Sequence, residues 1–407
     1  MAPSPAPARA PVARLLAPAL AALGFAAALS EAACGDDPLP RSYLGGGGAP
    51  PSGSTYGRPF VPGSPGSAGG GQGGEGGGAP SVALRSSAAI RCASAPLDLD
   101  APALSAVGAL GVREGAVDAA FGGEGYRVTP SAACLAAGGA GGAAGAGGAA
   151  GAGGAAGAGE FAPVGGLPDQ TVAWAPLPSG RRVAVTHEAL VLLDPGGIEL
   201  TRCALGASAG PGPKRRRAAF DPANPLHAWV VDGSATLYEG LLREDPSGGA
   251  SCESALEVSA GEPVALRDVA AGGAPGQIWL AVVASSSTEG SLAQVWRATR
   301  GAAALAVDLR WPGRTGGCAA GGLVSADAVA GLPGGGVAVA DGGCGAVVRF
   351  GAPLSPLDRA TLPAGEAPRA LAAAPDGSLF VASAIERLPG SRVGLWRVPP
   401  AAAAGAD

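Results

Sequence analysis

One segment of this chain has the spacing of a catalytic serine. Residues 206–210, Gly-Ala-Ser-Ala-Gly, match the G-x-S-x-G pattern, in which a serine hydroxyl attacks a carbonyl carbon. That arrangement needs a strand before the serine and a helix after it, but Pro211, Gly212 and Pro213 follow here, and proline disrupts a helix. His227 is the only histidine after Ser208, and it follows too closely for the usual Ser…Asp…His order. We therefore expect Ser208 to lie in a loop without catalytic function.

The other candidates for acid–base or metal chemistry are isolated. The only two histidines, His187 (next to Glu188) and His227, lie in or beside apolar runs, and either imidazole could exchange a proton near neutral pH. Two histidines without cysteine or carboxylate partners at ligand spacing do not predict a metal site. Asp98 and Asp100 lack the glycine and the distal glutamate of a calcium loop. The sequence thus predicts no catalytic residue, no metal site and no cofactor.

The cysteines favour an oxidising compartment. Apart from Cys34 near the start, there are six: Cys92, Cys134, Cys203, Cys252, Cys318 and Cys344. No two are close enough for a C-x-x-C motif, so neither a zinc site nor a thioredoxin-like centre is indicated. Six is an even number and suits three disulfides. We predict sequential pairing, 92–134, 203–252 and 318–344, because each pair would fall within one repeat-sized unit; buried free thiols are the alternative for some of them.

The N-terminus has the features of an export signal. Two arginines precede Leu15–Leu29, an uncharged apolar run that is too short to span a bilayer comfortably. Small residues then lead to Cys34. This arrangement resembles the lipobox of bacterial lipoproteins, which implies cleavage before Cys34 and acylation of that cysteine. Ordinary cleavage near Ala32 or Ala33, which would release a secreted protein, is the alternative.

The elements that would position any site are short strands in a recurring phrase. A turn precedes an apolar strand, a short polar loop follows, and a second apolar strand completes the phrase. The first strands are expected at Arg182–Val185, His227–Val231, Gln277–Val283, Val337–Ala340 and Ser378–Ala382. The second strands are expected at Ala189–Leu193, Ala235–Tyr238, Ala293–Arg297, Ala346–Phe350 and Val393–Trp396. Such a phrase at this spacing predicts an all-β fold, a β-propeller with one blade per repeat.

Composition sets the expected boundaries. We predict a signal peptide at 1–33, a disordered Gly/Pro/Ser tether at 34–80, a disordered Gly/Ala linker at 137–159 and a propeller at 160–400. The intervening residues 81–136 have modest apolar content and are expected to supply a blade or a ring-closing strand. A ring must close because an open arc exposes apolar faces and strand edges. Five repeats are visible, so we predict six blades, with five and seven as alternatives.

Some repeats resemble known propeller families. Asp327–Phe350, with its Val-Ala-Val-Ala-Asp strand, resembles an NHL-type repeat, and Pro368–Val398 is similar but has Ser383 in place of the family's aspartate. Ala218–Tyr238 resembles the Asp-box-like repeats of sialidase and sortilin-type propellers. The resemblance implies an architecture and little about function, because both families host unrelated roles.

An enzyme remains the alternative to a binding protein. Six-bladed lactonases of the gluconolactonase type would imply a central metal held by carboxylate and asparagine side chains, yet Asn224 is the only asparagine here. The sequence therefore favours a non-enzymatic propeller that binds or scaffolds, with a lactonase-like hydrolase or lyase using axial carboxylates as the second hypothesis.

Charge and aromatic content narrow the partners. The net charge of −5 argues against nucleic acid as a partner. The one basic cluster, Lys214–Arg217, is expected in a solvated loop, although it could bind an anion. The six tryptophans are expected in blade cores rather than on sugar platforms, and Asp341 is expected to cap its turn. We expect a protein or glycan ligand in the bacterial cell envelope (periplasmic or surface), contact with a membrane only through a lipid anchor, and secretion if Cys34 is not acylated.

Overall fold

A computed structural model describes residues 85–96, 107–113, 115–136, 159–206, 216–245, 248–286, 290–301, 304–311, 318, 322–352, 354–385 and 392–401. The predicted signal peptide, tether and most of the Gly/Ala linker lie outside these residues, as do Cys34, Ser208 and Lys214. All described residues belong to the unit Gly78–Asp407. Within them, no helix is both long enough and apolar enough to cross a membrane.

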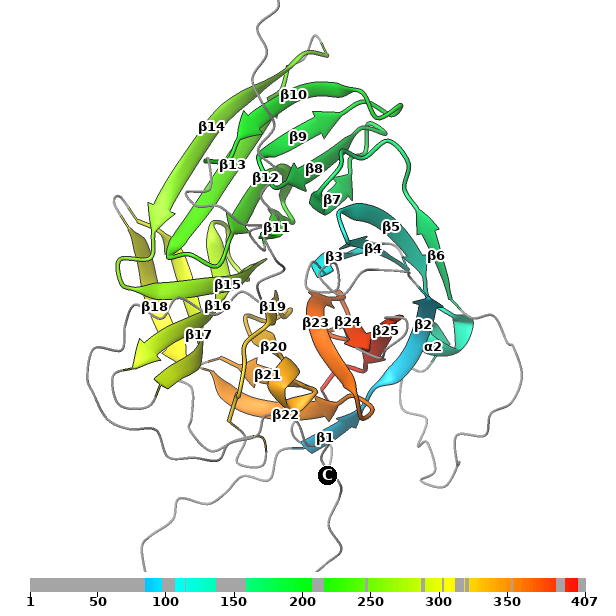
Figure 1. Ribbon diagram of the computed structural model, residues 1–407, viewed down its shortest axis with the longest axis vertical. Helices are drawn as coiled ribbons and strands as arrows, with labels where there is room; N and C mark the ends of the chain where they lie inside the picture. The colour runs from blue at the N-terminus through cyan, green and yellow to red at the C-terminus, as the bar shows by residue number, and fades with distance from the viewer. Residues whose placement is uncertain are drawn as a thin grey trace, which may run out of the picture. The chain divides into compact units, whose positions relative to one another are not determined.

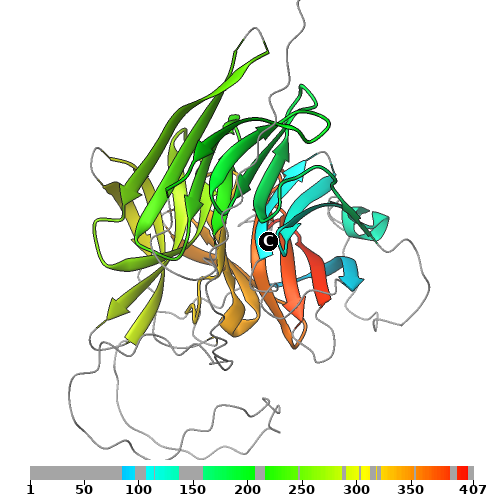
Figure 2. The ribbon, with the colours of Figure 1, turned by 45° about the horizontal axis from the view of Figure 1, so that its top comes forward.

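Six sheets stand around a common axis, as in a six-blade β-propeller (Figures 1 and 2). Blade 1 consists of β3 (Val107–Arg113), β4 (Ala116–Phe121), β5 (Glu124–Thr129) and β6 (Glu160–Pro163), with the short helix α2 (Ala132–Ala136) between β5 and β6. Blade 2 consists of β7 (Thr171–Pro176), β8 (Arg182–Thr186), β9 (Ala189–Leu193) and β10 (Glu199–Ala204). Blade 3 consists of β11 (Arg217–Asp221), β12 (Asn224–Val231), β13 (Thr236–Glu244) and β14 (Ala250–Ser259).

The other three blades follow in chain order. Blade 4 consists of β15 (Val264–Ala271), β16 (Gln277–Ser286), β17 (Gly290–Arg300) and β18 (Leu305–Trp311). Blade 5 consists of β19 (Ala328–Gly331), β20 (Val337–Asp341), β21 (Ala346–Gly351) and β22 (Ser355–Thr361), with the 3₁₀ turn η2 (Gly342–Cys344) between β20 and β21. Blade 6 contains β23 (Glu366–Ala373), β24 (Leu379–Ile385) and β25 (Arg392–Val398). Within each of these chain segments, successive strands pair antiparallel.

The N-terminal strands close the ring. β2 (Ile90–Pro96) pairs antiparallel with β25 and becomes the outer strand of blade 6, while β1 (Arg85–Ala88) adds in parallel to β22 of blade 5. Residues 81–136 thus supply both a closing strand and three of the four strands of blade 1. The ring therefore includes strands that precede residue 160, the start expected from the visible repeats.

Apolar strands form because each blade is covered on both faces by its neighbours. All five residues of β9 are buried, and so are all five of β20. Five hydrophobic clusters of the described residues each lie between two neighbouring blades. A sixth packs strands of blade 2 against the connection from blade 1. All six tryptophans are buried, as predicted. Two of them, Trp279 and Trp296, are the largest fully buried side chains among the described residues, and both lie in blade 4. This is the packing by which repeat architectures bury apolar surface.

Three disulfides join Cys92 to Cys134, Cys203 to Cys252 and Cys318 to Cys344, the pairs expected from sequential pairing. The expectation that each pair falls within one repeat-sized unit is wrong for two of the disulfides, because each of these two connects neighbouring blades. The first links β2 of blade 6 to α2 of blade 1, and the second links β10 of blade 2 to β14 of blade 3. The disulfides thus connect parts of the ring that strand pairing does not.

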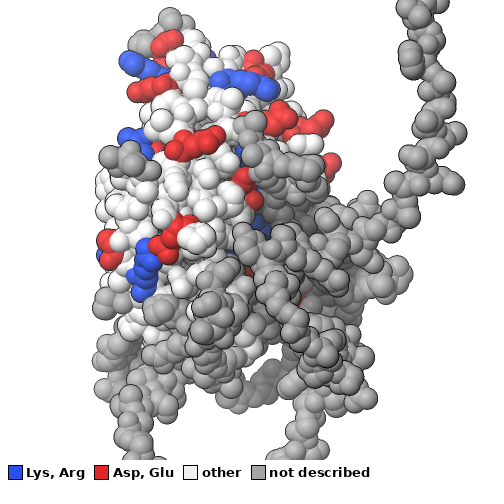
Figure 3. All heavy atoms as spheres, turned by 60° about the vertical axis from the view of Figure 1, so that its left-hand side comes forward, with Lys and Arg blue, Asp and Glu red and all other residues white. Residues whose placement is uncertain are grey.

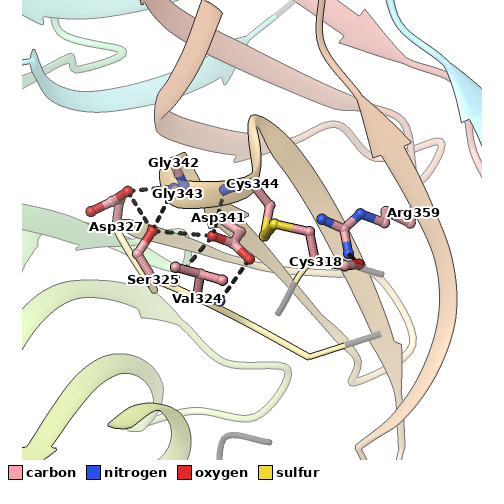
Figure 4. Close-up of a disulfide and its surroundings, with 9 residues drawn as sticks. All are labelled: Cys318, Val324, Ser325, Asp327, Asp341, Gly342, Gly343, Cys344 and Arg359. Atoms are coloured by element: carbon pink, nitrogen blue, oxygen red, sulfur yellow. Dashed lines mark hydrogen bonds between the residues drawn. A yellow bond between two sulfur atoms is a disulfide. The ribbon is translucent and has the colours of Figure 1, made fainter. Parts of the chain in front are cut away.

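The third disulfide fixes a turn of blade 5 (Figure 4). Beside it, the Asp341 carboxylate accepts backbone N–H bonds from Cys344 at 3.1 Å and from Ser325 at 3.0 Å. The N–H of Val324 donates to the same carboxylate at 3.0 Å. Asp341 therefore caps its turn, as the sequence predicts. At the corresponding position of blade 6, the Ser383 hydroxyl and the Trp396 indole donate to the Glu366 carboxylate instead.

Candidate functional site

A cavity of about 820 Å³ lies between the inner strands of all six blades. Its lining includes residues of the innermost strands β3, β7, β11, β15, β19 and β23 and of the turns that follow them. We call this cavity the central well. A cavity formed jointly by every repeat is the usual place for a ligand in this kind of architecture, and its volume lies within the range of roughly 300–1,000 Å³ typical of small-ligand sites.

Burial changes along the inner strands, and this shows where the well opens. In β11 the first two residues are buried, the next three are half-buried, and Pro222 beyond them is exposed. β19 shows the same trend, as does β15 from Asp268 onward, and they lead to exposed Pro333 and Gly273. The well is therefore closed near the start of the inner strands and open at the turns between the first and second strand of each blade. We call these turns the mouth.

Two charged side chains form the floor of the well. Arg217 at the start of β11 is 8% exposed, and its Nη1 donates to the carbonyl oxygen of Gly108 in β3 at 3.2 Å. Asp268 in β15 is also 8% exposed, and its Oδ2 accepts the backbone N–H of Val329 in β19 at 2.9 Å. These bonds, with the attraction between the two charges, connect the inner strands of four blades at one level.

The Asp268 carboxyl is poised to change charge near neutral pH. Burial raises its pKa to about 6, although the Arg217 charge and the backbone N–H groups of Val329 and Val269 act in the opposite direction. The more distant charge of Asp327 adds to the rise. The cost of burying the carboxylate therefore exceeds what its present neighbours return.

The wall of the well is mostly apolar, and most of its side chains are small. Most of the lining is alanine, glycine, valine, leucine or proline, and Gln277 is the only neutral polar side chain among the described lining residues. Each inner strand pairs on one edge only within the described sheets. The other edge faces the axis, so backbone N–H and C=O groups line the well between small side chains.

The polar groups nearer the mouth are tied to neighbours. Nη1 of Arg113 donates to the carbonyl of Pro176 in blade 2 at 2.8 Å, and Asp118 pairs with Arg127 at 3.0 Å. These contacts connect strands and hold the wall in place.

A second polar cluster lies at the β11–β12 turn. Nε2 of His227 lies 2.8 Å from Oε1 of Glu239, and Nδ1 lies 3.4 Å from Oδ2 of Asp221. Burial alone would lower the pKa of His227, but the hydrogen bonds and charges of Glu239 and Asp221 outweigh it and raise that pKa. Glu239 and Asp221 thus stabilise the imidazolium form of His227, which contacts both carboxylates. Asp221 lines the well, but the histidine itself does not.

The structure places the other predicted residues apart from one another. His187 lies in the β8–β9 turn, where burial and the positive charge of Arg216 lower its pKa. It is therefore not brought together with His227 in β12. The prediction that the basic cluster Lys214–Arg217 is solvated is wrong for two of its residues. Arg216 is 3% exposed and donates to the carbonyls of Leu205 and Gly206, and Arg217 lies in the floor of the well. Strand formation buries both guanidinium groups, because the strand starts at Arg217.

Among the described residues, no group of three or more histidine, cysteine, aspartate or glutamate side chains is arranged to hold a metal ion. The outer side of the ring that Figure 3 shows carries acidic and basic side chains interspersed with many uncharged ones. Two ion pairs involve arginines of blade 4, Arg297–Asp308 at 2.7 Å and Arg310–Glu262 at 2.6 Å. The central well is a feature of the described residues that could enclose a ligand.

No family model matches the chain, and no curated protein matches it in sequence. Its structural neighbours are six-blade β-propellers. A calcium-binding regucalcin from Agrobacterium tumefaciens is 16% identical, covers 73% of this chain and 93% of that chain, and has a TM-score of 0.43. An inactive virginiamycin B lyase from Staphylococcus aureus with quinupristin is 10% identical, with coverage of 72% and 80% and a TM-score of 0.41. A gluconolactonase from Xanthomonas campestris is 14% identical, with coverage of 58% and 75% and a TM-score of 0.36. The similarity is one of fold, and at these identities it indicates no shared ligand or reaction.

Proposed function

We propose that this protein is an exported β-propeller that binds a ligand in its central well without transforming it, and that a lipid on Cys34 anchors it in the cell envelope. The observation that supports binding is the well itself, a cavity of about 820 Å³ with a mostly apolar wall and a floor of one acid and one base. Such a site can desolvate and orient a ligand.

The environment of the well favours binding over catalysis. Covalent catalysis needs a nucleophile beside a base. The described lining has no serine, threonine, cysteine, lysine or histidine, and each of its aspartates, Asp118, Asp221 and Asp268, contacts a protein neighbour. Arg217 and Asp268 are engaged with the backbone of other blades. These contacts give both side chains a structural task that a reaction would disturb.

Export is supported by the disulfides. Three disulfides are consistent with a protein that folds outside the cytoplasm. The apolar run before Cys34 and the small residues beside it support cleavage and acylation.

One observation favours a second candidate function, a hydrolase or lyase. Asp268 is an axial carboxyl, and burial raises its pKa to about 6. A general base works best with a pKa near the working pH. In this alternative, Asp268 would remove a proton from a substrate held in the well.

A capture experiment tests the proposal. The full chain, exported so that its disulfides form, is immobilised and incubated with a tryptic digest of envelope proteins and, separately, with a mixture of neutral and acidic oligosaccharides. Retained molecules are eluted and weighed by mass spectrometry. The key variant is Gly111→Trp, because Gly111 lines the well and a Cβ built on it meets no atom within 4 Å. The matched control is Gly165→Trp, since Gly165 has the same open surroundings but does not line the well.

We expect retention by the wild type and by Gly165→Trp, loss of retention by Gly111→Trp, and eluted molecules of unchanged mass. Equal retention by both tryptophan variants would show that the well is not the site. Eluted molecules whose mass has changed, with the change lost in Asp268→Asn, would favour the enzyme.

A further inference from the structure

We propose that His227 is a proton-dependent switch at the mouth of the central well: the imidazolium holds the Asp221 carboxylate, and loss of its proton frees that carboxylate to face the mouth. This inference rests on the proposed function, because it concerns the regulation of the same well. Three features support it: the contacts of the imidazole, the bonding of each carboxylate, and the position of Asp221.

The imidazole of His227 lies between two carboxylates from different strands. Its Nε2 is 2.8 Å from Oε1 of Glu239 in β13, and its Nδ1 is 3.4 Å from Oδ2 of Asp221 at the end of β11. The side chains of His227, Asp221 and Glu239 are 15%, 17% and 12% exposed. A carboxylate only accepts hydrogen bonds, and a neutral imidazole has one N–H. The imidazole can therefore donate to both carboxylates only when it is protonated.

The contact with Asp221 is the one that deprotonation breaks. Glu239 has the shorter contact, and Nη1 of Arg300 in β17 donates to its other carboxylate oxygen at 3.3 Å. The Trp229 ring packs against the imidazole with 4.5 Å between the ring centroids and restricts its rotation. The neutral imidazole therefore keeps its proton on Nε2, facing Glu239. Its Nδ1 lone pair then faces Oδ2 of Asp221, where two acceptors repel each other.

Asp221 lies where this repulsion can be relieved. It lines the well, and the pairing of β11 with β12 is irregular between Phe220 and Asp221. The next three residues, Pro222, Ala223 and Asn224, are exposed. Oδ1 of Asp221 accepts the backbone N–H of Ala223 at 2.9 Å, so the carboxylate can stay on its turn while Oδ2 leaves the imidazole. Its negative charge is then no longer neutralised at the mouth.

The charges that act on His227 are those of its two bonded carboxylates. Glu239 and Asp221 raise its pKa above the ordinary value of 6.5, although burial acts in the opposite direction. The strands that pack against β12 have other charged residues, and none of these shifts the pKa of His227. They are Arg182 in β8, Arg217 in β11, Arg243 and Glu244 in β13, and Arg267 and Asp268 in β15.

The direction of the pH dependence follows. Below the raised pKa of His227, the imidazolium offsets the charge of Asp221, and above it the mouth gains one uncompensated negative charge. The well should therefore take up cations more readily as pH rises through that pKa. Asp268 at the floor also becomes negative as pH rises past about 6, so the test must separate the two groups.

The first measurement reads the imidazole itself. The full chain, exported so that its disulfides form, is labelled with ¹⁵N-histidine, and long-range NMR spectra distinguish the imidazolium from the two neutral tautomers between pH 5 and 9.5. The chain has two histidines, so His187→Gln assigns the signals of His227. We expect one titration, with the proton on Nε2 above its midpoint. Asp221→Asn should lower the midpoint. Asp194→Asn is the matched control, because Asp194 accepts the N–H of Ile198 in another turn, and it should leave the midpoint unchanged.

The second measurement reads the charge at the mouth. The Ala223 amide is observed by ¹⁵N-alanine labelling and assigned with Ala223→Ser. Its relaxation is enhanced by a nitroxide with a trimethylammonium group, which is a cation at every pH, and separately by a neutral hydroxyl nitroxide. The ratio of the two enhancements corrects for access to the amide. Ala255, which is exposed in β14, is the reference amide.

The ratio at Ala223 should rise about twofold across the His227 titration, the enrichment that one charge about 8 Å away produces in water. It should stay at its higher level throughout in His227→Gln, apart from any change due to Asp268, and it should be constant at Ala255. A ratio that changes equally in the wild type and in His227→Gln would overturn the switch.

The wild-type spectra alone can also overturn this inference. An imidazole that does not titrate, or a neutral tautomer with its proton on Nδ1, would exclude the release of Asp221. If capture is then still lost in Gly111→Trp, the proposed function stands without this regulation. Equal capture by Gly111→Trp and Gly165→Trp would overturn the proposed function whatever the tautomer of His227.

Discussion

Removing the Cys92–Cys134 disulfide should loosen the ring where its two ends meet. This bond joins the closing strand β2 to α2 of blade 1, and both sulfur-bearing residues are buried at 2% and 0% exposure. Beside it, Nη1 of Arg397 in β25 donates to the carbonyls of Cys134 and Leu135 at 2.9 Å. The double variant Cys92→Ala/Cys134→Ala leaves the β2–β25 pairing without this covalent support.

The magnitude follows from the length of the closed loop. The two cysteines are 42 residues apart, and the entropy of a loop of that length corresponds to about 4 kcal/mol at 25 °C. The pair Cys318→Ala/Cys344→Ala is a matched control, because its separation of 26 residues corresponds to about 3.5 kcal/mol, but it lies in blade 5. Total losses of stability should therefore be similar, while their locations should differ.

Hydrogen exchange with mass spectrometry locates the loss. In Cys92→Ala/Cys134→Ala, amides of β2 and β25 should exchange faster while those of β9 and β12 keep the wild-type rate. In the blade 5 control, β2 and β25 should keep their protection. If the first variant left the exchange of β2 and β25 unchanged, or if both variants affected them equally, the role assigned to this disulfide would be wrong.

Three further predictions concern single residues. The pKa of His227 is raised above its ordinary value of 6.5, so the stability advantage of the wild type over His227→Gln should be full below pH 6.5 and shrink as pH rises through the raised pKa. Urea unfolding at pH 5.5, 7 and 8.5 would measure this advantage. An advantage that grows with pH would contradict the prediction. Gly108→Ala should cost about 1–3 kcal/mol of unfolding free energy, because its Cβ would lie 2.1 Å from the carbonyl oxygen of Val172. The control Gly111→Ala should change the unfolding free energy by less than about 0.5 kcal/mol. Equal melting temperatures for the two variants would refute the packing argument. Cys34→Ser should move the exported chain from the detergent-rich to the aqueous phase of a Triton X-114 separation, and no difference from the wild type would refute the anchor.

The strands could be predicted where local pattern and turn chemistry agree. β9 has the bounds expected from the sequence, and β8, β20 and β21 differ from expectation by one residue at one end. Each is a short apolar run between turns, and several of those turns use glycine at positive φ, such as Gly180. The number of blades could be predicted because an open arc would expose apolar faces, and the structure has six.

The origin of blade 1 could not be fixed in advance. Its outer strand β6 follows the Gly/Ala tract, far along the chain from β5, and its pattern is only partly buried. The partner of β2, β25, likewise lies far away, at the other end of the described chain. Pairing over such separations depends on the ring as a whole, and no local signal in the sequence specifies it.

The floor of the well could not be predicted either. Arg217 belongs to a basic run that suggests a solvated loop, yet it begins a strand, and the apolar residues after it were the only hint of burial. Asp268 is one carboxylate among many until β15 brings it to the axis. Because the pair comes from different blades, only the closed ring brings it together.

The capture experiment tests the central claim most directly, that a ligand is bound in the central well. We expect the wild type and Gly165→Trp to retain the ligand and Gly111→Trp to lose it, because Gly111 lines the well and Gly165 does not. Equal retention by the two tryptophan variants would contradict this claim.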